Sequence, residues 1–274
     1  MSLLPNDVDF LRSAIAERSG NVISRSQSYL LESRLSPVAT EAGLRDVHAL
    51  VAELKNNPRN PLHNAVTEAM TINETSFFRD MQPFDALRDH VVPEFLGLRK
   101  ISRRLSIWSA ACSSGQEPYS IAMLLRTHFP QLATWGVKLL STDYSTEMVE
   151  RTKAGLYSQF EVNRGLPSAC IVRHFTRTGL RWQVKPDLRQ LIVAKKLNLT
   201  EEWPLNTKHD VVFLRNVLIY FDRTTKEQIL KRVHQSMCKD GYLFLGGGET
   251  LIQLDAPFEH MTIGKTVCYR PVAE

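Results

Sequence analysis

A turn of small residues followed by an acid is the stretch of this sequence best suited to chemistry. The apolar run Leu105 to Ala111 meets a turn at Cys112 to Gly115, and Glu117 then opens a segment of helical character. In open α/β sheets, ligands bind outside the carboxyl ends of the strands, where helix N-termini direct free N–H groups at them. The turn contains neither GxGxxG nor GK[ST], so it predicts neither a dinucleotide site nor a phosphate loop.

The acid in this turn favours a cofactor that carries hydroxyls or an amine over one that carries phosphates. S-adenosylmethionine (SAM) is such a cofactor. Asp143 follows the next predicted strand, 137–141, where nucleotide-binding α/β folds place the ribose contact. It lies 28 residues after Gly115, which leaves room for a helix and a strand between them. From these residues alone, a SAM-type site and an ordinary strand-to-helix turn both stay open.

Length and composition bound the remaining possibilities. The 274 residues suffice for one large domain or two smaller ones. Without an apolar run of membrane length or a basic secretion signal at the start, we expect a soluble cytoplasmic protein. The cysteines are far apart and form no CxxC, so they predict reduced thiols and no metal site. They are Cys112, Cys170, Cys238 and Cys268.

Positive charge is concentrated in one part of the chain. Residues 1–80 contain eight Lys/Arg and ten Asp/Glu, a net charge of −2, whereas the whole chain carries +5. Residues 151–196 contain ten basic and two acidic residues, a net charge of +8. Such a field favours an acidic partner, either a nucleic acid or a glutamate-rich protein surface, although a solvated face without a partner is the alternative.

The first seventy residues have the periodicity of helices. Asp46 is placed as the N-cap of one of them, and a further helix is expected from Leu62 to about Met70. The predicted apolar stripes are Val8, Leu11 and Ile15; Leu30, Leu31 and Leu35; and Val47, Leu50, Val51 and Leu54. The stretch TINETSFFRD, residues 71–80, then reads as a linker whose Phe77 and Phe78 pack into the next domain, ahead of a helix over 84–98.

The second half alternates strands with helices, as in an α/β fold. A helix over 223–237 is predicted, with Asp222 as its cap, Met237 as the last residue of its apolar stripe and Gly241 as its stop. The triple glycine of GGGET, 246–250, predicts a loop with unusual dihedral angles. The other predicted elements are strands over 210–214, 242–245 and 266–270, a helix over 147–154, and a hairpin-like turn at Gly264.

Residues 157–196 fit this alternation poorly. A short helix near 166–175 precedes alternating segments around 181–184 and 191–194, which predicts a small antiparallel β insertion. The insertion carries most of the positive charge, so it is a natural place to recognise a macromolecular substrate.

Five blocks of the sequence, taken together, resemble the CheR family of chemoreceptor glutamate O-methyltransferases. Each block is weak alone, but their order and spacing over residues 71–222 are specific, and the helical N-terminal part fits as well. They read TINETSFFRD, WSAACSSGQEPYSIA, STDYSTEMV, KKLNLTE and FLRNVLIYFD.

The resemblance implies an α/β fold of the SAM-dependent methyltransferase type. Its sheet would be mostly parallel and seven-stranded, with a last antiparallel strand, beside a small all-helical N-terminal domain. The implied organisation is a helical domain over 1–70, a linker over 71–84 that contributes to the active site, and a methyltransferase domain over 85–274 that contains the β insertion at about 157–196.

The resemblance also implies roles for individual residues. Arg79 and Tyr220 would lie nearest the methyl group and the incoming carboxylate. Asp143 would bind the ribose hydroxyls. Gln116 departs from the glutamate of many members, but Glu117 is retained. The implied cofactor-binding residues are Asn73, Thr75, Arg79, Ala111, Glu117, Asp143, Asn198, Leu199, Arg215 and Asn216, with no metal.

The implied reaction methylates receptor glutamates with SAM and yields S-adenosylhomocysteine. The implied partner is the cytoplasmic helical bundle of chemoreceptors, with a monomeric enzyme recruited to receptor arrays and without membrane insertion. Some members use a longer glycine-containing loop in the insertion to bind a receptor C-terminal pentapeptide; HFTRTGLRWQ is short and resembles the pentapeptide-independent type. A nucleic-acid methyltransferase and a non-catalytic receptor adaptor are the alternatives; against the first, RNVLIY stands where adenine methyltransferases carry [DN]PP[YF].

Overall fold

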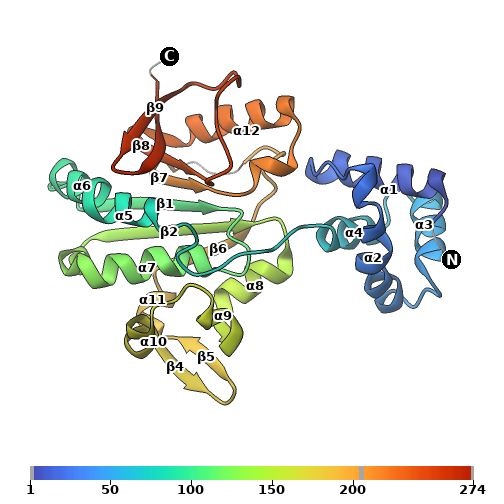
Figure 1. Ribbon diagram of the computed structural model, residues 1–274, viewed down its shortest axis with the longest axis horizontal. Coiled ribbons are helices and arrows are strands. Elements are labelled where there is room, and N and C mark those ends of the chain that lie inside the picture. Colours follow the sequence, from blue (N-terminus) through green and yellow to red (C-terminus); the bar gives the residue numbers. More distant parts are fainter. Residues whose placement is uncertain (1–2, 204–206, 273–274) are drawn as a thin grey trace.

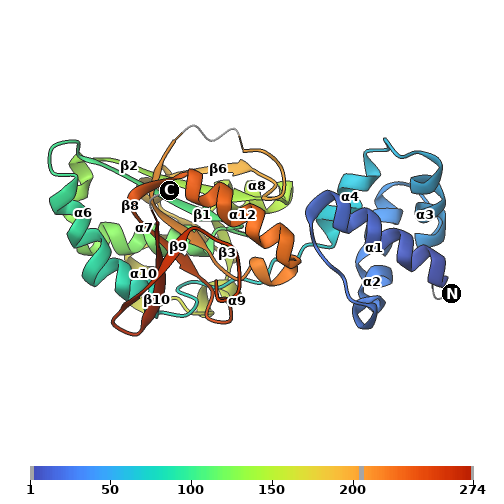
Figure 2. The ribbon, with the colours of Figure 1, turned by 90° about the horizontal axis from the view of Figure 1, so that it is seen from above.

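The computed structural model describes residues 3–203 and 207–272, which form two bodies joined by an extended segment (Figure 1). A helical bundle from the N-terminal part of the chain stands at one end, and a larger body of sheet and helices contains the rest. The view turned by 90° shows the same separation (Figure 2). None of the described helices has the length and apolarity needed to span a membrane.

The N-terminal body is built from helices whose apolar stripes meet in one core. Leu11, Ile15, Leu31 and Leu35 are fully buried there, as the periodicity predicts. The Asp46 carboxylate accepts the N–H of Ala49 at 2.9 Å, which confirms the predicted N-cap. The elements are α1 (Pro5–Ser19), the 3-10 turn η1 (Arg25–Gln27), α2 (Tyr29–Glu41), α3 (Val47–Asn56) and α4 (Leu62–Ala69).

The linker is anchored to the larger body by its two phenylalanines, as predicted. The Phe77 ring is fully buried and packs edge-on against Tyr157 and Phe175, with centroids 5.0 and 5.8 Å away. The Phe78 ring packs edge-on against Phe84 at 5.3 Å. The chain then continues through α5 (Gln82–Ala86), a π-helical turn η2 (Leu87–Val91) and α6 (Val92–Leu98), where one helix over 84–98 was expected.

The main sheet has seven strands within the described residues, in the order β6-β2-β1-β7-β8-β10-β9. The pairings from β6 to β8 are parallel, and β10 runs antiparallel to both of its neighbours, so the predicted sheet is confirmed. The strands are β1 (Arg104–Ala110), β2 (Gly136–Asp143), β6 (Ile192–Lys196), β7 (His209–Leu214), β8 (Met237–Leu245), β9 (Phe258–Ile263) and β10 (Thr266–Pro271). A turn at Gly264, with φ +58°, joins the last two.

Helices cover both faces of the main sheet. Successive residues of a strand point to opposite faces, so Ile107 joins the core under α7, whereas Trp108 joins the core under α12. In β7, likewise, Phe213 joins the core under α7 and Leu214 joins the core under α12. Further helical elements beside the main sheet are α7 (Gln116–His128), the 3-10 turn η3 (Pro130–Thr134), α8 (Thr146–Ala154) and α12 (Arg223–Gln235).

The predicted end of α12 is wrong. The helix ends at Gln235, and Met237 begins β8, which is longer than the predicted strand over 242–245. Met237 is buried in the core under α12, so it continues the apolar period of the helix without belonging to it. Gly241 lies inside β8, beside a register irregularity against β7; a Cβ there would approach Cys238 O to 2.9 Å. Close backbone approach, not a helix stop, explains this glycine.

The insertion is smaller than predicted. Its antiparallel sheet has the order β3-β5-β4, formed by Leu156–Ser158, Arg181–Val184 and Phe175–Thr178. The segment around 191–194 does not belong to it: β6 pairs in parallel with β2 at the edge of the main sheet. An edge strand is half exposed, so its apolar and polar residues alternate as they do in a strand of a hairpin. The insertion also contains α9 (Gln159–Asn163), α10 (Ser168–His174) and α11 (Pro186–Arg189).

A buried histidine at the start of β7 makes stability depend on pH. Burial lowers the pKa of His209 to about 4, although Asp210 opposes this. Its Nδ1 lies 2.9 Å from Ser106 Oγ. The folded chain keeps this ring neutral, whereas the unfolded chain protonates it below about pH 6.5. The contribution of the neutral ring to the unfolding free energy is therefore complete above about pH 6.5 and decreases as the pH falls toward about 4.

We therefore expect the wild type to lose about 2 kcal/mol more unfolding free energy than the variant His209→Gln between pH 7.5 and 5. Urea unfolding of both proteins at the two pH values measures this difference. His128→Gln, at an exposed histidine, serves as the control and should behave like the wild type. Equal losses in wild type and His209→Gln would contradict the assignment.

Candidate active site

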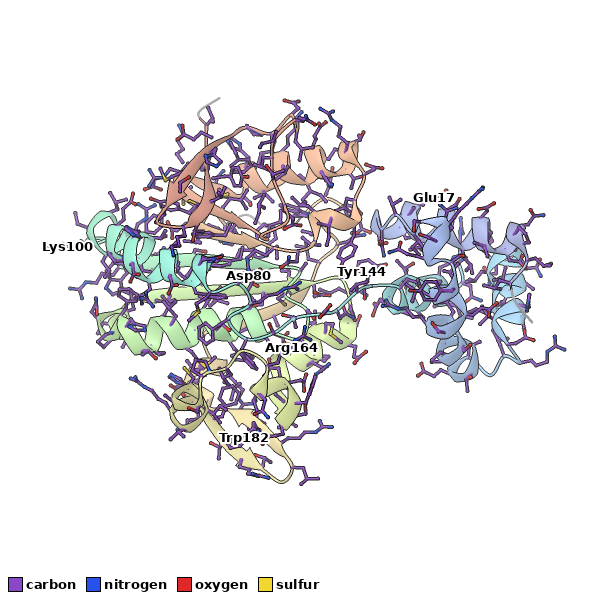
Figure 3. The ribbon with its side chains drawn as sticks, viewed as in Figure 1. Glu17, Asp80, Lys100, Tyr144, Arg164 and Trp182 are labelled. Atoms are coloured by element: carbon purple, nitrogen blue, oxygen red, sulfur yellow. The ribbon has the colours of Figure 1, made fainter. Side chains whose placement is uncertain are left out.

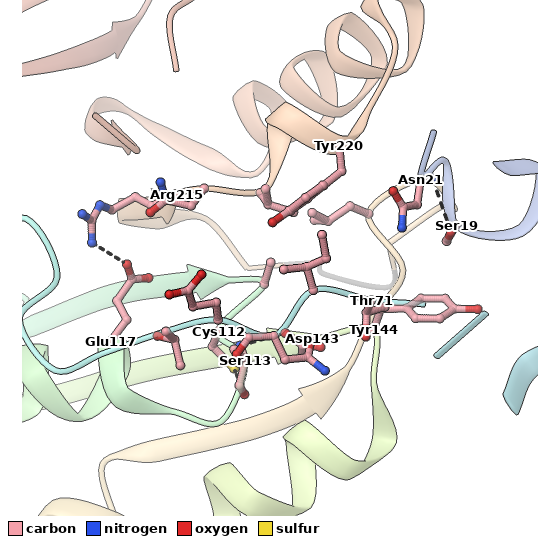
Figure 4. Close-up of a pocket in the computed structure, with 18 of the residues that line it drawn as sticks. Ser19, Asn21, Thr71, Cys112, Ser113, Glu117, Asp143, Tyr144, Arg215 and Tyr220 are labelled. Atoms are coloured by element: carbon pink, nitrogen blue, oxygen red, sulfur yellow. Dashed lines mark hydrogen bonds and ion pairs between the residues drawn. The ribbon is translucent and has the colours of Figure 1, made fainter. Parts of the chain in front are cut away.

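One cavity lies at the carboxyl ends of β1, β2 and β7 and is closed on the other side by the linker and the end of α1 (Figure 4). All eleven residues that the sequence analysis selected line it: Asn73, Thr75, Arg79, Ala111, Glu117, Asp143, Asn198, Leu199, Arg215, Asn216 and Tyr220. Tyr144, on the side of the larger body that faces the helical bundle, lines it as well (Figure 3).

The turn after β1 has the tight backbone that its small residues allow. Ala111 and Ser113 have φ of +54° and +50°, and Gly115, which caps α7, has φ +94°. A Cβ on Gly115 would lie 2.9 Å from the Tyr157 hydroxyl, so this position requires glycine. The turn thereby brings the backbone close to the cavity and directs the N-terminus of α7 toward it.

Asp143 ends β2 as an acceptor on the cavity wall. Its two carboxylate oxygens accept the N–H groups of Ser113 and Ser145 at 2.8 and 2.9 Å. Burial raises the pKa of Asp143, while these two hydrogen bonds act in the opposite direction. Each oxygen keeps a further lone pair, so the carboxylate can also accept hydrogen bonds from the hydroxyls of a ligand.

A buried ion pair joins the β1 turn to the segment after β7. Arg215 Nη1 lies 2.9 Å from Glu117 Oε2, and Ser109 Oγ donates to Glu117 Oε1 at 2.8 Å. Arg215 Nη2 donates to the carbonyl of Arg79 at 2.7 Å and pairs with Asp80 at 3.0 Å. Glu117 is therefore neutralised within the protein, a pairing that the sequence analysis did not foresee. Arg215 Nε is buried without a partner among the described residues.

Tyr220 and Arg79 both line the cavity. Tyr220 ends the 3-10 turn η4 (Leu218–Tyr220), and its carbonyl accepts the N–H of Val22 from the helical body at 2.9 Å. Burial raises the pKa of the Tyr220 phenol, so the phenol stays protonated at neutral pH, and Arg79 is close enough to oppose this. The Arg79 guanidinium donates a hydrogen bond to the carbonyl of Glu74 at 3.0 Å.

Asn198 already has protein partners for its amide. Its Nδ2 donates to the carbonyl of Arg18 at 2.8 Å, and its Oδ1 accepts from the hydroxyl and N–H of Thr200. In the same region, the carboxylate of Glu68 from α4 accepts the N–H of Thr146 at 3.0 Å and pairs with Lys196. These contacts hold the helical body against the larger one beside the cavity.

About half of the cavity lining was missed from the sequence. The signal was weakest for Ser19 and Asn21, at the end of α1, because no local pattern shows that this helix meets the larger body. The others could have been found as neighbours of the selected blocks. The missed residues are Ser19, Asn21, Thr71, Ile72, Glu74, Ser76, Cys112, Ser113, Tyr144, Leu197, Val217 and Phe221.

A possible metal-binding cluster lies elsewhere. Within the described residues, the one group with suitable spacing is Asp210, Cys238 and Asp240. Arg99 bridges both carboxylates, with its Nη2 2.9 and 2.6 Å from their oxygens, and so occupies the position between them. None of these residues lines the cavity.

Two family models match consecutive parts of the chain. The CheR methyltransferase all-alpha domain matches residues 6–71, and the CheR methyltransferase SAM binding domain matches residues 73–267. The chain belongs to the CheR methyltransferase family. The resemblance drawn from the sequence blocks is thereby confirmed, together with the methyltransferase fold and SAM as the cofactor.

Curated CheR relatives match almost from end to end. Chemotaxis protein methyltransferase Cher2 of Pseudomonas putida is 37% identical, over 96% of this chain and 97% of the relative. Chemotaxis protein methyltransferase 1 of Pseudomonas aeruginosa is 38% identical, over 98% and 99%. Among solved structures, a TehB-like SAM-dependent methyltransferase from Corynebacterium glutamicum matches 78% of this chain and 100% of its own at 14% identity and a TM-score of 0.38, and the family membership does not rest on it.

The cavity of this CheR chain fits the chemical groups of SAM. Asp143 has lone pairs that can accept hydrogen bonds from hydroxyl groups, and the wall also carries the apolar side chains of Leu197 and Leu199. The Nε–H of Arg215, which has no partner among the residues that the structure describes, is a donor suited to a carboxylate. The donor, acceptor and apolar groups on the wall thus correspond to those of the cofactor.

Proposed function

We propose that this CheR chain methylates glutamate side chains on the cytoplasmic helical bundle of chemoreceptors. The observation that carries the proposal is the convergence of Arg79 and Tyr220 on a cavity whose inner wall suits SAM. The chemotaxis methyltransferase relatives support the same substrate class. The product would be a γ-glutamyl methyl ester.

The chemistry requires positioning more than acid or base catalysis. A glutamate side chain is ionised at neutral pH, since its reference pKa is about 4.3. When bound, SAM supplies an electrophilic methyl group: an O–C bond to the carboxylate forms as the S–C bond breaks, S-adenosylhomocysteine leaves, and no proton moves. The chain's residues align the acceptor and exclude water, which is worth roughly 7 to 11 kcal/mol in well-aligned systems.

Two residues at the cavity are proposed to bind and orient the acceptor carboxylate. Arg79 steers the incoming carboxylate, because its guanidinium makes one hydrogen bond to the described part of the chain and lines the cavity. A very strong ion pair with Arg79 would lower the nucleophilicity of the acceptor carboxylate. A single arginine that contacts the carboxylate from one side therefore suits this role. The protonated Tyr220 phenol lines the same cavity and is proposed to donate to the same carboxylate.

The cofactor contacts are proposed along the cavity wall. Asp143 binds the ribose hydroxyls, Asn198 and Leu199 surround the adenine, and Arg215 with Asn216 lies along the methionine part. The linker contributes Asn73, whose carbonyl accepts the Ser113 hydroxyl at 2.8 Å, so the linker and the β1 turn close on the cofactor together. The remaining proposed contacts are Thr75, Arg79, Ala111 and Glu117.

Receptor docking is proposed at the groove that adjoins the cavity and at the basic insertion. The groove shares Asn21, Ile72 and Tyr220 with the cavity, so a receptor helix lying in it would bring a glutamate to Arg79. Arg34 of α2 donates to the carbonyl of Thr71 at 2.8 Å and therefore also holds the linker. Opposite charge on the insertion, which includes the exposed Arg177 and Arg181, would orient an acidic receptor bundle.

Transfer of a labelled methyl group from SAM to isolated receptor tests the proposal. We expect the label to enter receptor protein and to be released by mild base, because a carboxyl ester is base-labile. Base-stable label in nucleic acid would favour the nucleic-acid methyltransferase, and no transfer would favour the adaptor; neither alternative is favoured by the family match.

The insertion is also expected not to bind a receptor C-terminal pentapeptide. β4 ends at Thr178 and β5 begins at Arg181, so a turn of two residues, with Gly179 at φ +60°, leaves no extended loop against which a peptide could pair. Isothermal titration of the pentapeptide into the full chain should show no heat of binding. A micromolar Kd would contradict this prediction.

A further inference from the structure

The loop after β8 holds the segment that follows β7 through one carboxylate. Glu249, the acid of GGGET, is half-buried and makes no ion pair among the described residues. Its oxygens instead accept backbone N–H groups from both loops. Oε2 accepts those of Asn216 at 2.7 Å and Gly246 at 2.8 Å, and Oε1 accepts those of Val217 at 3.0 Å and Ile219 at 3.3 Å.

The held segment begins with a turn whose backbone N–H groups need acceptors. Asn216 has φ +58°, a left-handed conformation that glycine and asparagine adopt more readily than other residues. Its N–H and that of Val217 find their acceptor in Glu249. Removal of the carboxylate would leave these donors unpaired where little water reaches, and hydrogen bonds to a charged acceptor are among the stronger ones in proteins.

One glycine of the loop, Gly246, serves this contact and not a special dihedral angle. None of Gly246, Gly247 and Gly248 has a positive φ, so the prediction of unusual dihedral angles is wrong. A Cβ on Gly246 would lie 2.5 Å from Asn216 Nδ2 and 2.8 Å from Glu249 Oε2. Glycine at 246 therefore lets the two loops approach, and Glu249 fixes them.

The segment that Glu249 holds carries five residues of the cavity wall: Arg215, Asn216, Val217, Tyr220 and Phe221. Arg215 and Tyr220 are both seen above the cavity in Figure 4. Glu249 itself does not line the cavity. We propose that Glu249 is a positioning residue, which sets Asn216 and Tyr220 against the cofactor and the acceptor; the role of those two residues rests on the proposed function.

Glu249→Gln in the full chain tests the proposal, because it keeps the size of the side chain and replaces one acceptor oxygen by a donor. We expect faster amide hydrogen exchange in residues 215–221 and a Kd for S-adenosylhomocysteine about tenfold higher. At saturating SAM and receptor, kcat should fall about 100-fold, as misplaced reacting groups do elsewhere. Glu249→Asp, which keeps the charge and withdraws the oxygens by one methylene, should recover part of kcat and provides the test if Glu249→Gln does not fold.

Glu227→Gln is the matched control. Glu227 is also half-buried and accepts a backbone N–H, that of Asp255 at 3.1 Å, but it lies in α12 and lines neither the cavity nor the adjoining groove. This control should keep wild-type kcat and affinity. Wild-type amide exchange and wild-type kcat in Glu249→Gln would overturn the proposal. A variant with a lower melting temperature, but with wild-type kcat and affinity at assay temperatures well below that melting temperature, would also overturn it. Failure of the wild type itself to bind S-adenosylhomocysteine would instead refute the proposed function.

Discussion

The variant Arg79→Ala is expected to lose about 100-fold in kcat/KM for receptor methylation while keeping its fold. Within the described residues, the guanidinium makes one hydrogen bond, to the Glu74 carbonyl, so its removal should change the unfolding free energy by less than about 1 kcal/mol. The loss of activity follows because a carboxylate acceptor without a steering cation adopts fewer reactive orientations. Initial rates of labelled methyl transfer, together with urea unfolding, measure both quantities.

Arg223→Ala provides the matched control for this prediction. Arg223 also donates to a backbone carbonyl, that of Gln253, and pairs with Glu227 at 3.0 Å. It lies in α12 and lines neither the cavity nor the adjoining groove. A kcat/KM near that of the wild type is expected in this control. A kcat/KM in Arg79→Ala equal to that of Arg223→Ala would refute the proposed role of Arg79.

The elements of the fold could be predicted from local pattern wherever one face of an element is buried. Leu11 and Ile15 in α1 show helical periodicity, and Asp46 caps α3 as expected. The pattern of apolar residues gave two wrong predictions, the end of α12 and the extent of the insertion. Burial, and not local conformation, determines where apolar residues recur. Met237 packs in the core under α12 although it belongs to β8, and the half-exposed β6 alternates like a hairpin strand.

The site could be predicted only as a set of positions. The sequence blocks selected residues that the chain topology then brings to one cavity, since β1, β2 and β7 end at the same edge of the sheet. The partners of these residues could not be predicted. Glu117 and Arg215 are 98 positions apart, and Glu249 follows Asn216 by 33, so no local pattern indicates that they meet.

The contribution of Ser19 and Asn21 was beyond prediction for a different reason. Both lie at the end of α1 in a body with its own core, and only the placement of that body beside the larger one brings them to the cavity. The contact between Glu68 and Thr146 helps to determine this placement. Periodicity reports which face of a helix is buried, and it contains no information on how two separate cores are set against each other.

The variant Arg215→Ala is expected to destabilise the larger body by about 3–5 kcal/mol. The Arg215 side chain is 2% exposed, and its removal leaves Glu117 as a buried charge without its cation. Breaking a buried pair from one side costs this much because the remaining charge is not solvated. Urea unfolding followed by tryptophan fluorescence measures the change, and the Kd for S-adenosylhomocysteine should rise as well, since both residues line the cavity.

Two further variants separate this cost from a general effect of truncation. Asp80 also pairs with Arg215, but its side chain is 45% exposed, so Asp80→Ala should cost less than about 1 kcal/mol. The double variant Arg215→Met, Glu117→Gln should cost less than the sum of its single changes, because it leaves no unpaired buried charge. If Arg215→Ala is no more destabilising than Asp80→Ala, the ion pair does not stabilise the junction between the start of α7 and the segment after β7.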